Sequence, residues 1–201
     1  MLGLGDIGAA AAMPVMEGKS ALYKKFGNID AIPIVINSKD KDEIVHTIQL
    51  LEKSFAGINL EDFSSPKCYD IEDELKATMN IPVFHDDQHG TAIAALAAVI
   101  GALRLTKKKI DEVKVVISGA GAAGTAIARL LLEDGVRAEN MTILNSKGIL
   151  YDNGKLNRIQ KALVSEVNPE NKQGTFVEAV KGADILVASL SLIHISEPTR
   201  L

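Results

Sequence analysis

The sequence is poor in the residues that mark several large classes of protein. It has one cysteine, Cys68, no tryptophan, and only 4% aromatic residues. One cysteine excludes an internal disulfide framework and fits a reducing compartment, so we expect a cytoplasmic protein. There is also no basic surplus, since 22 Lys and Arg stand against 26 Asp and Glu, a net charge of −4. This balance argues against nucleic acids and anionic membranes as partners and favours small metabolites.

Long uninterrupted apolar runs are absent as well. The longest, residues 91–105, ends at a threonine and a run of lysines, short of the roughly 18 to 20 residues that a membrane-spanning helix needs. The apolar residues 1–15 have no basic flank and are interrupted by Asp6, three glycines and Pro14, which is not typical of a signal peptide. We therefore expect no membrane partner. With 47% hydrophobic residues, the chain can bury one large or two small cores.

Short β-branched runs alternate with helical periodicities, a pattern typical of parallel strands joined by crossover helices. The predicted strands are residues 32–36, 57–60, 81–84, 113–118, 141–144 and 185–188. The predicted helices begin near Asp40 or Asp42 and at Asp70, and others cover 91–105, 121–132, 155–164 and 175–181. The helix at 91–105 is apolar nearly all round, which predicts a buried link between two halves. We expect an α/β protein with a Rossmann-type parallel sheet, helices on both of its faces, and part of a smaller α/β domain before it.

A glycine-rich loop stands where a dinucleotide-binding loop is expected. It follows the apolar strand VKVVIS and consists of Gly119, Ala120, Gly121, Ala122, Ala123 and Gly124. In such a loop the first glycine permits a tight turn, the second lets the backbone approach a pyrophosphate, and the third lets the helix pack on the sheet. The amides of the helix N-terminus then face the phosphates. We predict an NAD or NADP site here, with a tight turn that binds no ligand as the alternative.

The residues that would choose between the two cofactors are ambiguous. At the end of the second strand, where Asp or Glu favours NAD, the sequence has Asn145, Ser146 and Lys147. Asn145 can hydrogen-bond a ribose hydroxyl, while Ser146 and Lys147 could bind a 2′-phosphate. The alternative is that these three are ordinary exposed loop residues, which have the same composition. A second match to the glycine pattern, at residues 3–8, has no preceding strand, and its context indicates a different kind of turn.

Two acidic pairs each follow a predicted strand. Glu61 and Asp62 follow one, and Asp86 and Asp87 follow the next along the chain. Because ligands of α/β folds bind at the carboxyl edge of the sheet, both pairs can gather there. Several carboxylates need a cation between them, and hard oxygen ligands suit Mg²⁺ or Mn²⁺. Surface acids at strand ends are the alternative.

Lys19 lies in an otherwise apolar, glycine-punctuated segment, PVMEGK, where a lysine is unusual unless it is exposed. By itself this residue is interpreted as a surface lysine. It could act as a base only if burial or a neighbouring cation lowered its pKa from about 10.4 towards roughly 7 to 8.

Four segments together resemble the bacterial malic enzyme family. They are GLGDIGAAAAMPVMEGKSALY at residues 3–23, NLEDF at 59–63, PVFHDDQHGTA at 82–92 and SGAGAAG at 118–124, in the order and approximate spacing of that family. The resemblance covers residues 2–188. It implies a metal-dependent, NAD(P)-dependent oxidoreductase that converts L-malate to pyruvate and CO₂, and a homo-oligomer in the complete enzyme.

The resemblance also assigns roles to individual residues. Lys19 matches the catalytic lysine, which would take the hydroxyl proton of malate while C2 gives a hydride to the nicotinamide. Glu61, Asp62 and Asp87 match the ligands of a divalent metal, Mg²⁺ or Mn²⁺, which polarises the C2 oxygen. Asp86 becomes a neighbour of that site.

Departures from the family limit what these residues are expected to do alone. The implied division is a partial malate- and metal-binding domain at 1–90 and an incomplete NAD(P)-binding Rossmann domain at 91–189. The general-acid tyrosine of the family lies upstream of the segment at 3–23, so we expect the 201-residue polypeptide to be inactive or nearly so. Residues 190–201 contain SLIHISEPTR, which resembles a translated transposon-type sequencing adapter, and we expect a non-native tail; an ordinary C-terminal peptide is the alternative.

Two other functions remain open from the sequence. One is another two-domain metabolite dehydrogenase, of an amino-acid or methylene-tetrahydrofolate type, which also carries a glycine loop after a substrate domain. The other is a non-catalytic dinucleotide-binding module whose acidic residues are surface groups. Dependence on a divalent metal and on malate would separate a malic enzyme from both.

Overall fold

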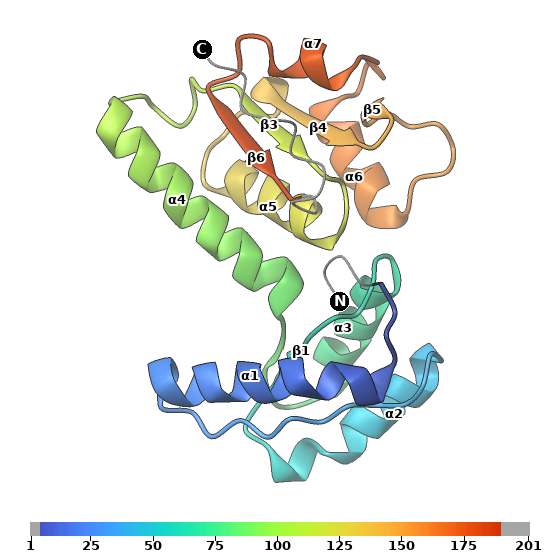
Figure 1. Ribbon diagram of the computed structural model, residues 1–201. Coiled ribbons are helices and arrows are strands. Elements are labelled where there is room, and N and C mark those ends of the chain that lie inside the picture. Colours follow the sequence, from blue (N-terminus) through green and yellow to red (C-terminus); the bar gives the residue numbers. More distant parts are fainter. Residues whose placement is uncertain (1–4, 190–201) are drawn as a thin grey trace.

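The computed structural model describes residues 5–189, which form two main hydrophobic cores joined by the long helix α4 (Thr91–Thr106) (Figure 1). The predicted non-native tail at 190–201 lies outside the described residues. The chain begins in the lower part of Figure 1 and crosses to the upper part along α4. The two parts also meet where side chains of α3 (Lys67–Thr78) contact side chains of α5 (Ala122–Glu133) and α6 (Arg158–Val167).

The first part contains a two-stranded parallel sheet covered by helices. Its elements are α1 (Ala9–Gly27), α2 (Lys41–Leu50), the 3₁₀ turn η1 (Glu52–Ser54), β1 (Ile58–Leu60), α3 (Lys67–Thr78) and β2 (Val83–His85). Strands β1 and β2 pair with Leu60 opposite His85, so both strands end at the same level. The core between the sheet, α2 and α3 consists of Ile44, Val45, Ile48, Leu60, Ile71, Leu75, Met79 and Val83.

The second part is a mostly parallel four-stranded sheet with the order β5-β4-β3-β6. It follows a π-helical turn, η2 (Asp86–Gly90), and its elements are α4 (Thr91–Thr106), β3 (Val115–Ser118), α5 (Ala122–Glu133), η3 (Ala138–Asn140), β4 (Met141–Asn145), β5 (Gly148–Ile149), α6 (Arg158–Val167), α7 (Phe176–Val180) and β6 (Ile185–Ala188). Strands β4 and β6 flank β3 in parallel, and only the two-residue β5 is antiparallel. The α/β class and the Rossmann-type sheet predicted from the sequence are confirmed.

Local sequence signals explain where several helices begin. The Asp40 side chain accepts hydrogen bonds from the amides of Asp42 and Glu43, so Asp40 is the N-cap of α2. Asp40 is one of the two residues that were predicted to begin this helix. Asn157 and Thr175 cap α6 and α7, each in a reciprocal capping box. A helix is present where α3 was predicted, but its predicted start was wrong, because α3 begins at Lys67 and Asp70 lies inside it.

Two further expectations are corrected by the structure. Residues 32–36 form no strand, and Ile32 and Ile34 are exposed, because β1 and β2 pair with each other and neither pairs with this segment. Helix α4 is not buried all round: Ala92 and Val99 are its buried residues, whereas Leu105 is 87% exposed. One face of α4 therefore packs on the core, and its other apolar side chains lie on the surface.

The helical segment Asp86–Thr106, which joins η2 to α4, is long and apolar enough to cross a membrane by length and composition only. A core helix of a soluble protein passes the same test, and one such helix is weak evidence. Its first turn is engaged with the rest of the chain, because Asp86 and Asp87 contact Lys19 and the amide of Asp62.

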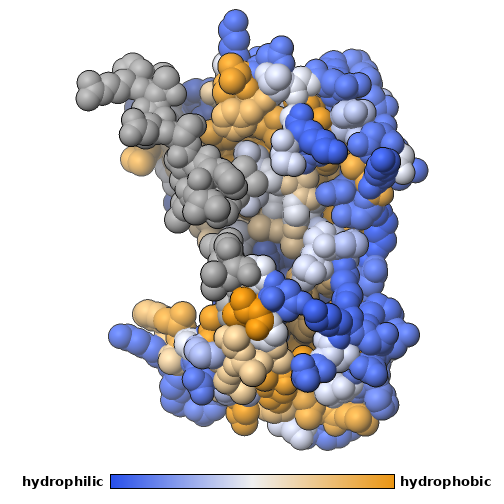
Figure 2. Space-filling model, turned by 45° about the vertical axis from the view of Figure 1, so that its right-hand side comes forward, coloured by the Kyte–Doolittle hydropathy of each residue, from blue (hydrophilic) through white to orange (hydrophobic). Residues whose placement is uncertain are grey.

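Apolar side chains also gather on the surface of the first part, in the lower half of Figure 2. The exposed large hydrophobic residues of the first part are Val15, Leu22, Phe26, Ile29, Ile32, Ile34 and Leu50. Helix α1 contributes no fully buried residue. Its polar contacts with the rest of the first part include those of Lys19 with Glu61 and Asp86, and the hydrogen bond from Tyr23 to Asn59.

Candidate active site

The acidic residues gather where β1 and β2 end. Glu61 directly follows β1, and Asp86 and Asp87 open the η2 turn directly after β2. Because the two strands are parallel and in register, their carboxyl ends lie side by side, as the sequence predicted. The amide of Asp62 donates to Oδ2 of Asp87 at 2.7 Å, which brings the loop after β1 into direct contact with the η2 turn.

Lys19 reaches this edge from α1. Its Nζ lies 2.5 Å from Oδ2 of Asp86 and 3.1 Å from Oε2 of Glu61, so it bridges the two strand ends. Partial burial lowers the pKa of Lys19, but the hydrogen bonds and charges of Asp86 and Glu61 outweigh burial and raise the pKa above its ordinary value. Lys19 is therefore a protonated, partly buried ammonium in this state, and the interpretation as a surface lysine does not hold.

The neighbours of Glu61 shift the pKa of its carboxyl group in opposite directions. Burial raises its pKa, and the charge of Asp87 adds to that effect, whereas the hydrogen bond from Lys19 lowers the pKa; the net shift is upward. Nδ2 of Asn59 also donates to Oε2 of Glu61 at 3.1 Å, and the Tyr23 hydroxyl donates to Oδ1 of Asn59 at 3.0 Å. Sequence reasoning assigned no role to Asn59 or Tyr23, although both lie in segments quoted for the resemblance.

The acidic set suits a divalent cation by its donor chemistry. Carboxylate oxygens are the ligands that Mg²⁺ and Mn²⁺ prefer, and the charge of Asp87 makes the charged form of Glu61 less favourable, which a cation would relieve. Within residues 5–189, however, no three Asp, Glu, His or Cys side chains are arranged to hold a metal together. The backbone places the acids at one edge of the sheet, and Glu61 is engaged there by Lys19.

The glycine-rich loop has the geometry expected of a dinucleotide-binding turn. Gly119 adopts φ +119°, a conformation that favours glycine, and its amide donates to the carbonyl of Leu144 at 2.9 Å. A Cβ on Gly124 would lie 1.8 Å from the carbonyl oxygen of Gly119, so α5 can approach the turn only with glycine there. A Cβ on Gly121, in contrast, would meet no described atom within 4 Å. This loop edge is open for a ligand.

Two residues that sequence reasoning missed hold the loop in place. Nε2 of Gln160, on α6, donates to the carbonyl of Ala120 at 2.7 Å. The Thr125 hydroxyl donates to the carbonyl of Gly121 at 2.9 Å. The spacing of Asn157 and Gln160, which form the capping box of α6, is the only sequence signal that points to either residue.

The end of β4 presents Asn145 to solvent beside the loop. Its Oδ1 accepts the amide of Lys147 at 2.8 Å, so the side chain closes a local turn before β5. The side chains of Ser146 and Lys147 are exposed at this turn. Asn145 therefore has a local structural role, which is to close this turn.

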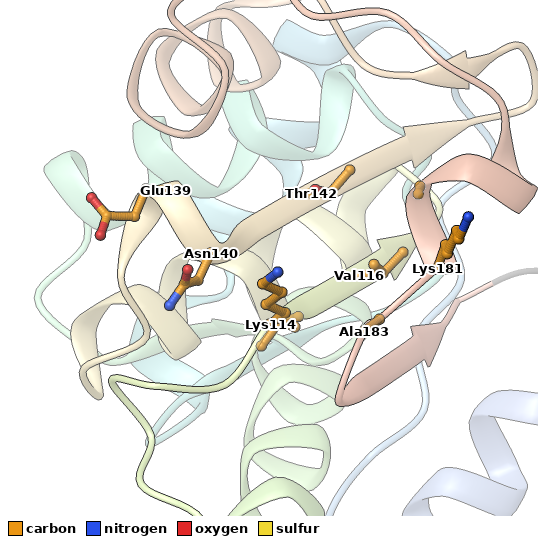
Figure 3. A pocket seen from close by; sticks show the side chains of 9 residues that line it. Lys114, Val116, Glu139, Asn140, Thr142, Lys181 and Ala183 are labelled. Carbon is orange, nitrogen blue, oxygen red and sulfur yellow. The ribbon is translucent and has the colours of Figure 1, made fainter.

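A separate cavity of about 190 Å³ lies at the opposite end of the strands (Figure 3). Its lining includes Lys114 and Val116 of the β3 region, Asn140 of η3, Thr142 of β4, and Lys181. Ligands of parallel α/β sheets bind at the carboxyl ends of the strands, and this cavity is at their amino ends. It is not part of the candidate active site.

Two family models match this chain, one in each of its two parts. Residues 1–42 match the family model "Malic enzyme, N-terminal domain", and residues 88–189 match "Malic enzyme, NAD binding domain". The bifunctional malic/malolactic enzyme of Bacillus subtilis is 47% identical over 190 residues, which cover 93% of this chain and 46% of the relative. The NADP-dependent malic enzyme of Haemophilus influenzae is 48% identical over 189 residues, which cover 93% of this chain and 25% of the relative.

A solved structure shows the same fold. The crystal structure of the NAD-dependent malic enzyme from Thermotoga maritima matches with a TM-score of 0.87 and 47% identity, over 94% of this chain and 50% of that chain. This chain therefore spans half, or less, of the length of these relatives. The family models together cover more than half of the 201 residues. This chain belongs to the malic enzyme family.

Proposed function

We propose that this chain carries the metal-binding edge and the nucleotide-binding loop of an enzyme that oxidatively decarboxylates L-malate to pyruvate and CO₂ with reduction of NAD or NADP. One observation carries the proposal: Lys19 meets Asp86 and Glu61 where the two parallel strands end. The names of the relatives, which include NAD- and NADP-dependent malic enzymes, support the same reaction.

In this proposal the acidic residues bind the metal, and Lys19 accepts a proton. Glu61, Asp62 and Asp87 are the proposed ligands of Mg²⁺ or Mn²⁺, which when bound would polarise the C2 oxygen of malate and stabilise negative charge that develops there. Nζ of Lys19 is the proposed acceptor of the C2 hydroxyl proton. Asp86 orients Lys19 through the 2.5 Å contact and keeps its Nζ on the side of Glu61.

Lys19 must give up its proton before it can act as this acceptor. In the structure its ammonium is stabilised by two carboxylates, which raise its pKa. Rotation of Glu61 towards a bound cation would remove one of these partners and leave Asp86 as the orienting group. In the arrangement seen here, Oε2 of Glu61 contacts both Lys19 and Asn59, and Asn59 accepts a hydrogen bond from the Tyr23 hydroxyl, so polar groups connect Lys19 to Tyr23.

The nucleotide site is proposed at the loop from Gly119 to Gly124, with Ala120, Ala122 and Ala123 between the glycines and Asn145 at the ribose edge. Gly121 has the open space that a pyrophosphate needs. In the same proposal, residues 1–90 belong to the malate- and metal-binding domain and 91–189 to the nucleotide-binding domain. The enzyme is proposed to act in the cytoplasm as a homo-oligomer, without a nucleic-acid or membrane partner.

The test uses the full-length protein, meaning the product of the complete genomic reading frame in which this sequence lies. Pyruvate and reduced cofactor are measured with malate, Mn²⁺ and either NAD or NADP, for the unaltered protein, Asp87→Asn and Asp30→Asn. Asp30 is an exposed acid paired with Lys24, and it serves as the matched control. We expect metal-dependent pyruvate formation that Asp87→Asn abolishes and Asp30→Asn preserves. Cofactor binding without pyruvate would support a non-catalytic nucleotide-binding module instead.

A further inference from the structure

Glu72 is a buried carboxylate in the middle of α3, and it is only 4% exposed. Its Oε1 lies 2.7 Å from Nζ of Lys76 and 2.7 Å from Nε2 of His89. Its Oε2 accepts a hydrogen bond from Nε2 of Gln88 at 3.0 Å. A carboxylate is almost never buried unless it is paired, and here both oxygens have partners.

The partners Gln88 and His89 belong to the same η2 turn as Asp86 and Asp87. This turn is held on two sides. Its first two residues face the candidate active site, where Asp86 contacts Lys19 and Asp87 accepts the amide of Asp62. Its next two residues are bound to Glu72 on α3. Single π-helical turns are rare and occur frequently at functional sites.

The η2 turn is also tightly wound. A Cβ on Gly90 would lie 2.0 Å from Oδ1 of Asp86, so the Asp86 carboxylate folds back against the backbone of Gly90. Gly90 has φ −63°, an ordinary helical value, so glycine is required for space and not for its backbone conformation. Because Asp86, Asp87, Gln88 and His89 are consecutive residues of this one turn, we expect movement of the last two to change the positions of the first two.

We propose that Glu72 is a positioning residue for the divalent-metal site: by binding Gln88 and His89 it fixes the η2 turn and thereby the direction of the Asp87 carboxylate. The inference rests on the proposed function, since it takes Asp87 as a metal ligand. Groups that orient metal ligands affect metal affinity strongly, and their replacement typically lowers it by about 10- to 100-fold. Glu72 needs no contact with the metal or with malate for this effect.

The experiment measures Mn²⁺ binding by the full-length protein from the electron paramagnetic resonance signal of free Mn²⁺, without malate or cofactor. Glu72→Gln keeps the size of the side chain but places an amide NH₂ against one of the surrounding donors. Gln88→Met removes the hydrogen bond between Gln88 of the η2 turn and Glu72. Lys76→Met removes a partner of Glu72 that lies outside the turn, and Glu74→Gln changes a half-exposed acid of the same helix that pairs with Lys41.

We expect Glu72→Gln and Gln88→Met each to raise the Mn²⁺ dissociation constant about 10- to 100-fold. Lys76→Met and Glu74→Gln should stay within about twofold of the unaltered protein. Circular dichroism and NAD(P) binding at the glycine loop monitor the fold. If Glu72→Gln fails to fold, Gln88→Met carries the test alone.

Unchanged Mn²⁺ affinity in folded Glu72→Gln or Gln88→Met would overturn the positioning role, and so would a failure of both variants to fold, because Glu72 would then be a structural residue. An equal loss of affinity in Lys76→Met would also overturn it, since the effect would follow the charge around Glu72 and not the link to the turn. If the unaltered protein itself does not bind Mn²⁺, the proposed metal site is wrong, and this outcome is distinguishable from the others.

Discussion

The hydroxyl groups of Tyr69 and Thr125 lie 3.0 Å apart and join α3 of the first part to α5 of the second. Both residues are buried, and Tyr69 packs in a small cluster with Cys68 and Ile159. The same Thr125 hydroxyl donates to the carbonyl of Gly121 in the nucleotide-binding loop. Helix α3 therefore contacts the loop region through Tyr69 and the η2 turn through Glu72.

Removal of the Tyr69 hydroxyl should weaken the contact between the two parts. Tyr69→Phe leaves the ring in place and deprives Thr125 of a partner, so we expect the free energy of unfolding to fall by about 1 kcal/mol. Urea denaturation measures this change, and a double-mutant cycle with Thr125→Val isolates the pair. Tyr151→Phe is the control, because the Tyr151 hydroxyl makes no hydrogen bond with the described residues. Additive effects of Tyr69→Phe and Thr125→Val would show that the two hydroxyls do not interact.

Two glycines of the same loop should respond differently to alanine. At Gly124 the added methyl would overlap the carbonyl of Gly119, so we expect Gly124→Ala to lower the free energy of unfolding by about 3 kcal/mol. At Gly121 the methyl meets no described atom, so Gly121→Ala should keep the fold and lose cofactor affinity. Thermal unfolding and cofactor titration separate the two effects. Gly101→Ala, in an open position of α4, is the control and should stabilise the helix by about 0.5–1 kcal/mol.

The cofactor preference should depend on Asn145. A carboxylate there would accept hydrogen bonds from a ribose and repel a 2′-phosphate, so Asn145→Asp should shift the ratio of kcat/KM for NAD over NADP towards NAD by about tenfold. Asn153 closes a comparable turn, with Oδ1 accepting the amide of Lys155 at 3.0 Å, and Asn153→Asp is the matched control. An unchanged ratio in Asn145→Asp would place the selection of cofactor elsewhere.

Much of the architecture was predictable because its causes are local. The glycine loop, the Asp40 cap and the acids after β1 and β2 each follow from a few neighbouring residues. The contacts that complete the site were not predictable, because they join distant positions: Gln160 binds Ala120, and Glu72 binds Gln88. Residues 32–36 show the opposite error, since a local strand pattern forms no strand without a pairing partner.

The pairing of Lys19 with Asp86 belongs to the same class of distant contacts, 67 residues apart in sequence. Spacing alone left Lys19 as a surface residue, and only the family resemblance indicated a catalytic role. The structure adds the physical reason that the side chain is not free in solvent, because two carboxylates hold its ammonium at the strand ends.

The most direct test of this account is the turnover of malate by the full-length Lys19→Ala variant, with and without added methylamine, beside Mn²⁺ and cofactor titrations. If Lys19 accepts the hydroxyl proton, kcat should fall by about 10²- to 10⁴-fold, methylamine should restore part of it, and both ligands should still bind. Turnover close to that of the unaltered protein, with Mn²⁺ and cofactor bound, would contradict the central role given to Lys19.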